Sequence, residues 1–487
     1  MAGRLDDFSD KLSPMLVKEL RQGLRAKTFV IVFLALQALL TFVLLISVGA
    51  TSSTNAGHVV SSVIFFFFSL AVLVVQPLRG IGSLHNEIRG NTIDLMVLTR
   101  MGTWRIVLGK WVAIVGQSAL LLAAIAPYLI LRYFFGRMDL FAELLLLMLV
   151  FLGSAVFTAV TVGLSALPSI LVRGLLPLFV AIYLGVCIFA VIFDGELKKM
   201  IDFCTLTAPH SGWVLLAGVV TAAYGGWSAL ALGASAIAPM AENHSTVRRL
   251  IALGAVIAVG LLGLLGKFDD DVTGPLLILF CAPAIAIALT EPMNMLPPVA
   301  RPFLHFGAMG KLAGRILYPG WASGVIFVGI LVIIAFGAFV IGRPPGNEHL
   351  KVSLVSAIGT LLFPGVILRF FSKKVKNALP FYMMILAATI AIAVAVMIAT
   401  IEAESDAFVW FLSWIPPVQV VLANVVSEKH YAQIVPAGAI PDFHPVLKIG
   451  IGTVATCGAF LLACAVKNFS FFREVENEAS SNPAPQP

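Results

Sequence analysis

The sequence predicts an all-α protein that crosses a membrane about twelve times. Of its 487 residues, 60% are hydrophobic and only 12% are charged, whereas a soluble domain carries about 25% charged residues. Apolar runs of bilayer-crossing length recur along the chain. The first, residues 28–49, has no ionisable side chain, and as a helix it would be roughly 33 Å long, enough for a hydrocarbon core of about 30 Å. Lipid offers backbone groups no hydrogen bonds, so these runs must be helices.

The apolar runs fall into two sets of six. We expect spans at residues 28–49, 59–76, 106–131, 140–165, 174–193 and 212–237, and again at 250–266, 272–290, 321–341, 352–368, 378–400 and 446–466. Two six-span halves, residues 28–241 and 242–467, would share one orientation and form a parallel repeat. Each half has its longest outer loop, with proline in it, between its fifth and sixth spans. Coincidence is the alternative, since proline is common in such loops.

The basic residues predict the orientation of the chain. If the N-terminus is inside, 23 of the 32 Lys and Arg residues fall in inner segments and 9 in outer ones. Basic residues accumulate in cytoplasmic segments, so we expect both termini in the cytoplasm, most simply across a bacterial cytoplasmic (inner) membrane. The net charge of +7 then reflects topology and not a nucleic-acid partner. The polar tail, residues 468–487, is expected to be a disordered cytoplasmic segment.

The cytoplasmic N-terminus, residues 1–27, contains an amphipathic helix. Ser13 can cap it, and Pro14 fits its first turn. Leu16, Leu20 and Leu24 recur on one face, and Lys18, Arg21 and Arg25 on the other. Such a helix lies flat among membrane lipids at the interface. It could be a simple anchor for the first span, or a lever that joins that span to a cytoplasmic partner.

The loop after the second span holds a second group of polar residues. Asn91 or Thr92 can cap a short helix whose apolar face is Ile93, Met96 and Val97. Gly102 would break this helix, and Thr103 can cap the next one, which becomes the third span. A short helix between two spans is suited to being displaced by a partner.

These two segments together resemble the permease domain of type-2 ABC transporters. The resemblance rests on a Glu after the second span, an Arg-Gly-x-Thr element, a Leu-rich turn and a Gly-Lys that enters the third span, together with the start of the N-terminal helix. The residues are Glu87, Arg89, Gly90, Thr92, Leu95, Leu98, Gly109 and Lys110, with Pro14, Lys18, Glu19, Leu20 and Arg21 in the helix. The specific match covers residues 13–111, and the six-span layout extends it to about 240.

The resemblance carries functional implications. It implies a transport permease, not an enzyme, in which a separate ABC ATPase subunit docks on the loop from Glu87 to Arg100. It also implies an export direction and leaves room for a second permease copy. ATP would bind to the partner, and no cofactor, metal or catalytic residue is expected in this chain. A P-loop needs Ser or Thr after Gly-Lys, but Gly109-Lys110 is followed by Trp111.

The second half departs from this pattern. Glu291 stands where Glu87 stands in the first half, but the Arg-Gly-x-Thr element is missing. Prolines at positions 292, 297, 298 and 302 forbid one continuous helix there. A weak apolar stripe follows opposite Lys311 and Arg315, formed by Met309, Leu312, Ala313, Ile316 and Leu317. This half could be degenerate, or an adaptor.

Two other functions compete with this interpretation. A twelve-span secondary transporter has the same layout, but proton relays place ionisable groups inside the bundle, and none lies near a span centre here. A lipid-modifying enzyme could place a metal among His85, Glu87, Glu242 and His244, although their spacing matches no metal motif.

Some span residues predict helix packing. Gln37 and Gln117 could bond between helices, which we favour, or face a pathway. Ala155, Ala159 and Gly163 share one face at helical spacing, which predicts close helix–helix contact.

Overall fold

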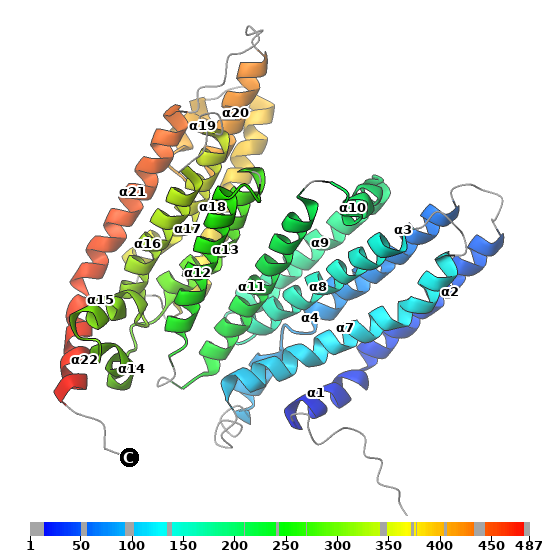
Figure 1. Ribbon diagram of the computed structural model, residues 1–487, viewed down its shortest axis with the longest axis horizontal. Helices are drawn as coiled ribbons and strands as arrows, with labels where there is room; N and C mark the ends of the chain where they lie inside the picture. The colour runs from blue at the N-terminus through cyan, green and yellow to red at the C-terminus, as the bar shows by residue number, and fades with distance from the viewer. Residues whose placement is uncertain are drawn as a thin grey trace, which may run out of the picture. The chain divides into compact units, whose positions relative to one another are not determined.

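The computed structural model is built of helices, with no strand among the residues it describes (Figure 1). It describes residues 14–49, 56–92, 102–133, 139–208, 210–239, 243–268, 270–340, 348–371, 375, 377–403, 407–432 and 444–481. The chain divides into two compact units, Met1–Ala238 and Pro239–Pro487. This division falls three residues before the expected boundary at 241.

Unit 1 contains the following helices. They are α1 (Pro14–Leu24), α2 (Lys27–Gly49), α3 (Ala56–Ser69), η1 (Leu70–Val75), α4 (Gln76–Leu78), α5 (Ser83–Arg89), α7 (Thr103–Tyr133), α8 (Leu140–Leu164), η2 (Leu171–Leu175), α9 (Leu176–Phe193), α10 (Glu196–Cys204) and α11 (Ser211–Ile237). The second span runs through α3, η1, α4 and α5, and the fifth through η2 and α9.

Unit 2 contains the remaining helices. They are α12 (Ser245–Leu264), α13 (Asp270–Thr290), α14 (Pro297–Leu304), α15 (Gly307–Leu317), α16 (Trp321–Val340), α17 (Glu348–Phe370), α18 (Ala378–Ala403), α19 (Ala407–Leu412), α20 (Val418–Ala432), α21 (His444–Lys467) and α22 (Phe469–Ser481). Its six spans are α12, α13, α16, α17, α18 and α21.

The helices confirm the predicted fold class. Eleven are long and apolar enough to cross a membrane, and a twelfth span is formed if the bent pair Leu16–Leu24 and Lys27–Val43 counts as one. Each of the twelve expected spans coincides with one of these helices. The bend between α1 and α2 is 57°, so α1 does not continue the direction of the first span. The protein is an all-α, many-span integral membrane protein.

Two spans contain a wide helical turn directly before a proline. In η1 the backbone N–H of Gln76 donates to Ala71 O, and in η2 that of Leu176 donates to Leu171 O. Both bonds reach back five residues instead of four. Pro77 and Pro177 follow, and a proline ring clashes with the carbonyl four residues earlier and offers no N–H. A π turn accommodates both the ring clash and the missing N–H without ending the helix.

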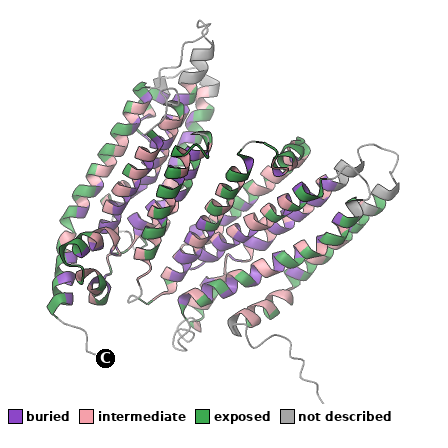
Figure 2. Cartoon of the chain, in the orientation of Figure 1, coloured by how far each residue is buried: buried purple, intermediate pink, exposed green. Residues whose placement is uncertain are grey.

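The same pairs of spans are in contact within each unit. In both, the second span packs on the first, third, fourth and fifth spans, and the sixth packs on the third and fourth. In both, the first span also packs on the third, and the segment between the fifth and sixth spans packs on the fourth and fifth: α10 in unit 1, α20 in unit 2. Buried residues lie along the contacting sides of the helices and exposed ones along the outer sides (Figure 2).

Small residues allow the closest of these helix contacts. A Cβ on Gly163 would overlap the Ala229 carbonyl group where α8 packs on α11, and a Cβ on Gly324 would overlap that of Ala288 where α16 packs on α13. The predicted packing role of the small-residue face in the fourth span is therefore confirmed. Trp111 Nε1 also donates to the Ala155 carbonyl at 2.8 Å.

The expectation of a disordered tail is wrong for most of its length. Residues 469–481 form helix α22, which packs on α14 and α21. Its buried side chains are Phe472, Val475, Glu476 and Ala479, a spacing that places them on one helix face. The overall polarity of the segment hides this stripe. Residues 482–487 lie outside the described part of the chain.

Candidate functional site: polar clusters at the ends of the spans

One lysine connects the N-terminal helix to the loop after the second span. Lys110 lies in the third span, and its Nζ is 2.9 Å from Glu19 Oε1 of α1 and 3.2 Å from Glu87 Oε1 of α5. Only 5% of the Lys110 side chain is exposed, against 18% for Glu19 and 16% for Glu87. A buried ammonium needs such carboxylate partners to offset its desolvation. These three residues form what we call the Lys110 cluster.

Thr92 fixes the position of Glu87 within this cluster. Its hydroxyl donates to the backbone carbonyl of Glu87 at 3.1 Å and also to the Glu87 carboxylate. The chain can return on itself because Asn91 adopts a left-handed conformation with φ 53°, which Asn tolerates better than most residues. The first residues of the loop after the second span are thus attached to the Lys110 cluster.

A second polar contact, centred on Arg79, attaches α1 to the second and third spans. The Arg79 guanidinium donates to Gln76 Oε1 at 3.0 Å, to Gln117 Oε1, and to the Gly23 carbonyl at 3.3 Å. The carbonyls at a helix C-terminus lack partners within the helix and attract cations. A Cβ on Gly23 would overlap the Gln117 amide, so a larger residue at this position would displace the Gln117 side chain.

The structure brings together some of the residues singled out from the sequence. Glu19, Glu87, Thr92 and Lys110 meet in the Lys110 cluster, and Gly109 is buried beside it. Leu20 is partly buried toward α7, where a Cβ on Gly116 would lie 3.5 Å from its Cδ2. Outside the cluster, Pro14 begins α1, and four residues are exposed: Lys18, Arg21, Arg89 and Gly90. Leu95, Leu98, Arg100 and the predicted short helix around Ile93 lie outside the described residues.

Sequence reasoning missed Arg79 and Gln76. Arg79 was counted only as an inner basic residue, although a Gln-Pro-Leu-Arg run at the end of an apolar stretch is a polar signal. The two glutamines noted within spans do bond between helices: Gln117 accepts from Arg79, and Gln37 Nε2 donates to the Ala124 carbonyl at 3.4 Å. Their predicted packing role is confirmed.

Unit 2 also places a glutamate directly after its second span. Glu291 accepts from Arg249 at 2.7 Å, from Arg248 at 3.1 Å, from the Gly320 backbone N–H at 3.1 Å and from the Ser245 hydroxyl. Arg249 is 4% exposed and donates further to Ser323 Oγ and to the Gly320 carbonyl. We call this group the Glu291 cluster.

The segment after Glu291 is interrupted, as its prolines predict. Residues 291–296 are not helical, Pro297 begins α14, and α15 follows after a break. Arg249 also donates to the Ile316 carbonyl at 2.8 Å, so the end of α15 is attached to the first span of the unit. Met309 and Leu312 of the expected stripe are 75% and 60% exposed.

The described residues hold no group of three His, Cys, Asp or Glu side chains placed to bind a metal ion. Of the residues considered for a metal, His85 and Glu87 belong to unit 1 and His244 to unit 2, and Glu242 lies outside the described part. Comparisons with family models, curated proteins and solved structures return no match. The fold, a bundle of many apolar helices with charged clusters at span ends, fits a transporter or permease in general.

Proposed function

We propose that this chain is the transmembrane permease of an ATP-driven transporter of the type-2 ABC kind. In this proposal a separate ATPase subunit binds ATP and docks on the loop that begins at Glu87. The chain itself performs no catalysis and binds no cofactor or metal. It lies in a bacterial inner membrane with both termini in the cytoplasm, and it acts in export, as the resemblance of residues 13–111 implies.

The Lys110 cluster is the observation that carries the proposal. It connects three elements that are separate in sequence: α1, the end of the second span and the start of the third. Displacement of the loop after Glu87 would move Glu87, and through Lys110 it would act on Glu19 and α1. The 57° bend after α1 lets this helix move without moving the whole first span. Charged pairs of this kind link elements without chemistry of their own.

The shared span contacts support a parallel repeat. Two units with the same pairs of contacting spans, each with a glutamate after its second span, are expected of two halves that cross the membrane in the same direction. We infer that both glutamates then lie on the cytoplasmic side. Only unit 1 retains the loop that resembles the ATPase-docking element.

The partner can be tested by purification of the full chain from its own membranes in mild detergent. We expect a P-loop ATPase polypeptide to co-purify and to hydrolyse ATP. Arg89 is exposed on α5 beside the proposed dock, so Arg89→Ala should reduce the recovered ATPase several-fold. The matched control, Lys199→Ala on α10, should retain the ATPase, since Lys199 lies on an exposed surface where it pairs with its neighbour Glu196.

The same experiment identifies the competing functions. If no ATPase is recovered after chemical crosslinking, and vesicles containing the purified chain accumulate substrate with an ion gradient alone, the chain is a secondary transporter. If the purified chain turns over a lipid substrate unaided, it is an enzyme. Either result overturns the proposal.

A further inference from the structure

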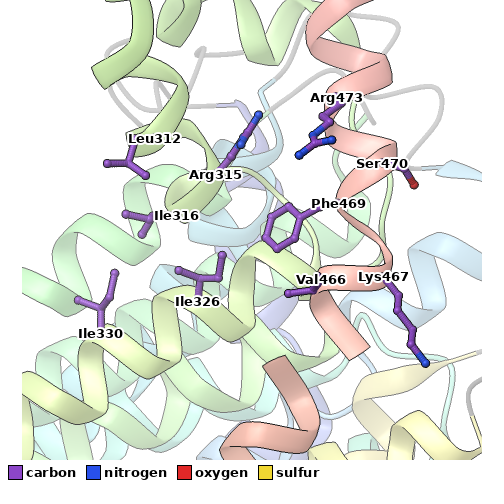
Figure 3. Close-up of a pocket in the computed structure, with 10 residues that line it drawn as sticks. All are labelled: Leu312, Arg315, Ile316, Ile326, Ile330, Val466, Lys467, Phe469, Ser470 and Arg473. Carbon is purple, nitrogen blue, oxygen red and sulfur yellow. The ribbon is translucent and has the colours of Figure 1, made fainter. Parts of the chain in front are cut away.

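A pocket of about 730 Å³ lies in unit 2 where α15, α16, α21 and α22 meet. Its lining is shown in Figure 3 and consists of Leu312, Arg315, Ile316, Ile326, Ile330, Val466, Lys467, Phe469, Ser470 and Arg473. The span in α16 begins at Trp321 and the span in α21 ends at Lys467. The pocket therefore lies at one boundary of the apolar layer, where lipid headgroups are found.

One side of the pocket is cationic. The guanidinium groups of Arg315 and Arg473 lie on the same side, next to Phe469, while Lys467 extends away from them (Figure 3). Arg315 Nη2 donates to Glu476 at 3.2 Å, and the buried Nε of Arg315 has no hydrogen-bond partner in the described part of the chain. No acidic side chain among the described residues pairs with Arg473. Of the two guanidiniums, only that of Arg315 thus has a carboxylate partner among the described residues, which leaves room for an anion.

The other side of the pocket is apolar and continues into the membrane. Ile326 and Ile330 lie one turn apart on α16, and Ile316 precedes them on α15. Ile330 is nine residues past the start of α16, roughly 14 Å along the helix at about 1.5 Å per residue. Val466, on the facing helix α21, is 64% exposed. This wall can contact a hydrocarbon chain for a substantial part of one leaflet.

We propose that this pocket binds an anionic phospholipid. The phosphate of the lipid would lie between Arg315 and Arg473. The part of an acyl chain nearest the headgroup would lie along Ile316, Ile326 and Ile330. A free phosphate would leave the apolar wall uncovered. A zwitterionic phospholipid would bring its own cation toward the two arginines, whereas basic pockets between membrane helices select anionic headgroups. Through Arg315, Arg473 and Phe469, the bound lipid would hold α22 against α15.

Lipid binding can be measured on the full-length protein in a mild detergent. The thermal unfolding midpoint is followed while phosphatidylglycerol is added, with phosphatidylcholine and sn-glycerol 3-phosphate as comparison probes. We expect phosphatidylglycerol to raise the midpoint at the lowest concentrations, phosphatidylcholine to require at least tenfold more, and glycerol phosphate, which lacks acyl chains, to have little effect. Arg473→Gln should weaken phosphatidylglycerol binding about fivefold, as expected for one basic residue near a lipid surface.

Arg473 is suited to this test because it is exposed and pairs with no described acidic residue. The double change Arg315→Gln with Arg473→Gln should weaken binding roughly twentyfold. Lys311→Gln is the matched control, since Lys311 is exposed on the same helix as Arg315 but does not line the pocket. Equal responses to the two phospholipids, an undiminished response in Arg473→Gln, or an equal loss in Lys311→Gln would each overturn the proposal.

Discussion

The two units place a glutamate at the same point, directly after the second span, but surround it differently. Glu87 pairs with Lys110, and this lysine also pairs with a second carboxylate, Glu19 of the N-terminal helix. Glu291 faces two arginines of α12, and one of these, Arg249, also binds backbone carbonyls of the segment that leads from α15 to α16. In the ion pairs of the described residues, two carboxylates therefore surround Lys110 in unit 1, whereas two arginines surround Glu291 in unit 2.

This difference separates an adjustable connection from a fixed attachment. The Lys110 cluster joins α1, which is bent by 57° from the first span, and its carboxylates are partly exposed. A carboxylate that moves away from Lys110 there can be partly hydrated. The Glu291 cluster is nearly buried, and its hydrogen bonds end on backbone groups that have few alternative partners. Displacement of such groups leaves buried polar atoms unsatisfied, which is expensive. We propose that unit 1 responds to a partner, whereas the corresponding part of unit 2 stays in place.

The largest expected effect is on the stability of unit 2. Arg249→Met should lower the free energy of unfolding by about 3–5 kcal/mol, because it leaves Glu291 and two carbonyls with fewer partners in a buried site. Thermal unfolding in mild detergent measures this. Glu291→Gln in addition should recover part of the loss, since a neutral amide needs no cation. Lys311→Met, an exposed control, should change the free energy of unfolding little. An equal loss in Lys311→Met would show that the effect does not come from the Glu291 cluster.

The next effect should separate stability from transport in unit 1. Lys110→Met should cost about 2–3 kcal/mol, less than Arg249→Met, because Glu19 and Glu87 retain some access to water. It should also abolish most ATP-dependent transport in vesicles, measured per folded protein. Lys27→Met, at an exposed position where α2 begins, is the control and should retain transport. If Lys110→Met destabilises more than Arg249→Met and yet transports normally, the Lys110 cluster is a structural attachment and not an adjustable connection.

A smaller effect is expected where α1 packs on α7. A Cβ at Gly23 would overlap the Gln117 amide, whose oxygen accepts from Arg79. Gly23→Ala should therefore displace the Gln117 side chain and lower the unfolding midpoint, because a hydrogen bond to a charged group contributes about 1.5–3 kcal/mol. Gly218 is a helical glycine of the same unit with open space around its Cβ position, so Gly218→Ala should be neutral or slightly stabilising. A neutral result for Gly23→Ala would show that the contact of Gln117 with Arg79 does not stabilise this region.

The smallest effect is a pH dependence confined to unit 2. Burial, and next to it the Glu476 carboxylate, raises the pKa of Tyr318 to about 12 from about 10. The folded state then keeps a proton that the unfolded state loses, so stability present below about pH 10 is lost as the pH rises toward 12. Tyr318→Phe retains the ring packing and should show a smaller fall in the unfolding midpoint between pH 8 and pH 11. Identical profiles for the two proteins would contradict this.

The spans could be predicted from the sequence, because in lipid a long apolar run has only one favourable structure. The wide turns before Pro77 and Pro177 could not be predicted. A hydrogen bond that reaches back five residues instead of four changes neither the composition nor the length of the apolar run. The helix α22 was missed although Phe472, Val475 and Ala479 have helical spacing, because the average polarity of the tail masked it.

The candidate site was predicted in part. Glu87, Thr92 and Lys110 lie within one stretch of sequence, and the resemblance identified them together. Their partner Glu19 was noted only as part of the N-terminal helix, and the role of Arg79 was not noted. Such partners depend on how helices distant in sequence pack, which hydrophobic periodicity does not specify. For the same reason Arg249 was counted only for its charge, although it contacts Glu291 and three neighbouring groups.

The central claim is that force from a partner ATPase reaches α1 through the Lys110 cluster. It is tested most directly by the distance between probes attached through non-natural amino acids at Gln22 of α1 and Leu120 of α7, both exposed, in the complex with its ATPase. We predict that ATP turnover changes this distance by about 2–5 Å, the range of helix shifts in such transitions, and that Lys110→Met removes the change. An unchanged distance during ATP hydrolysis would contradict the account.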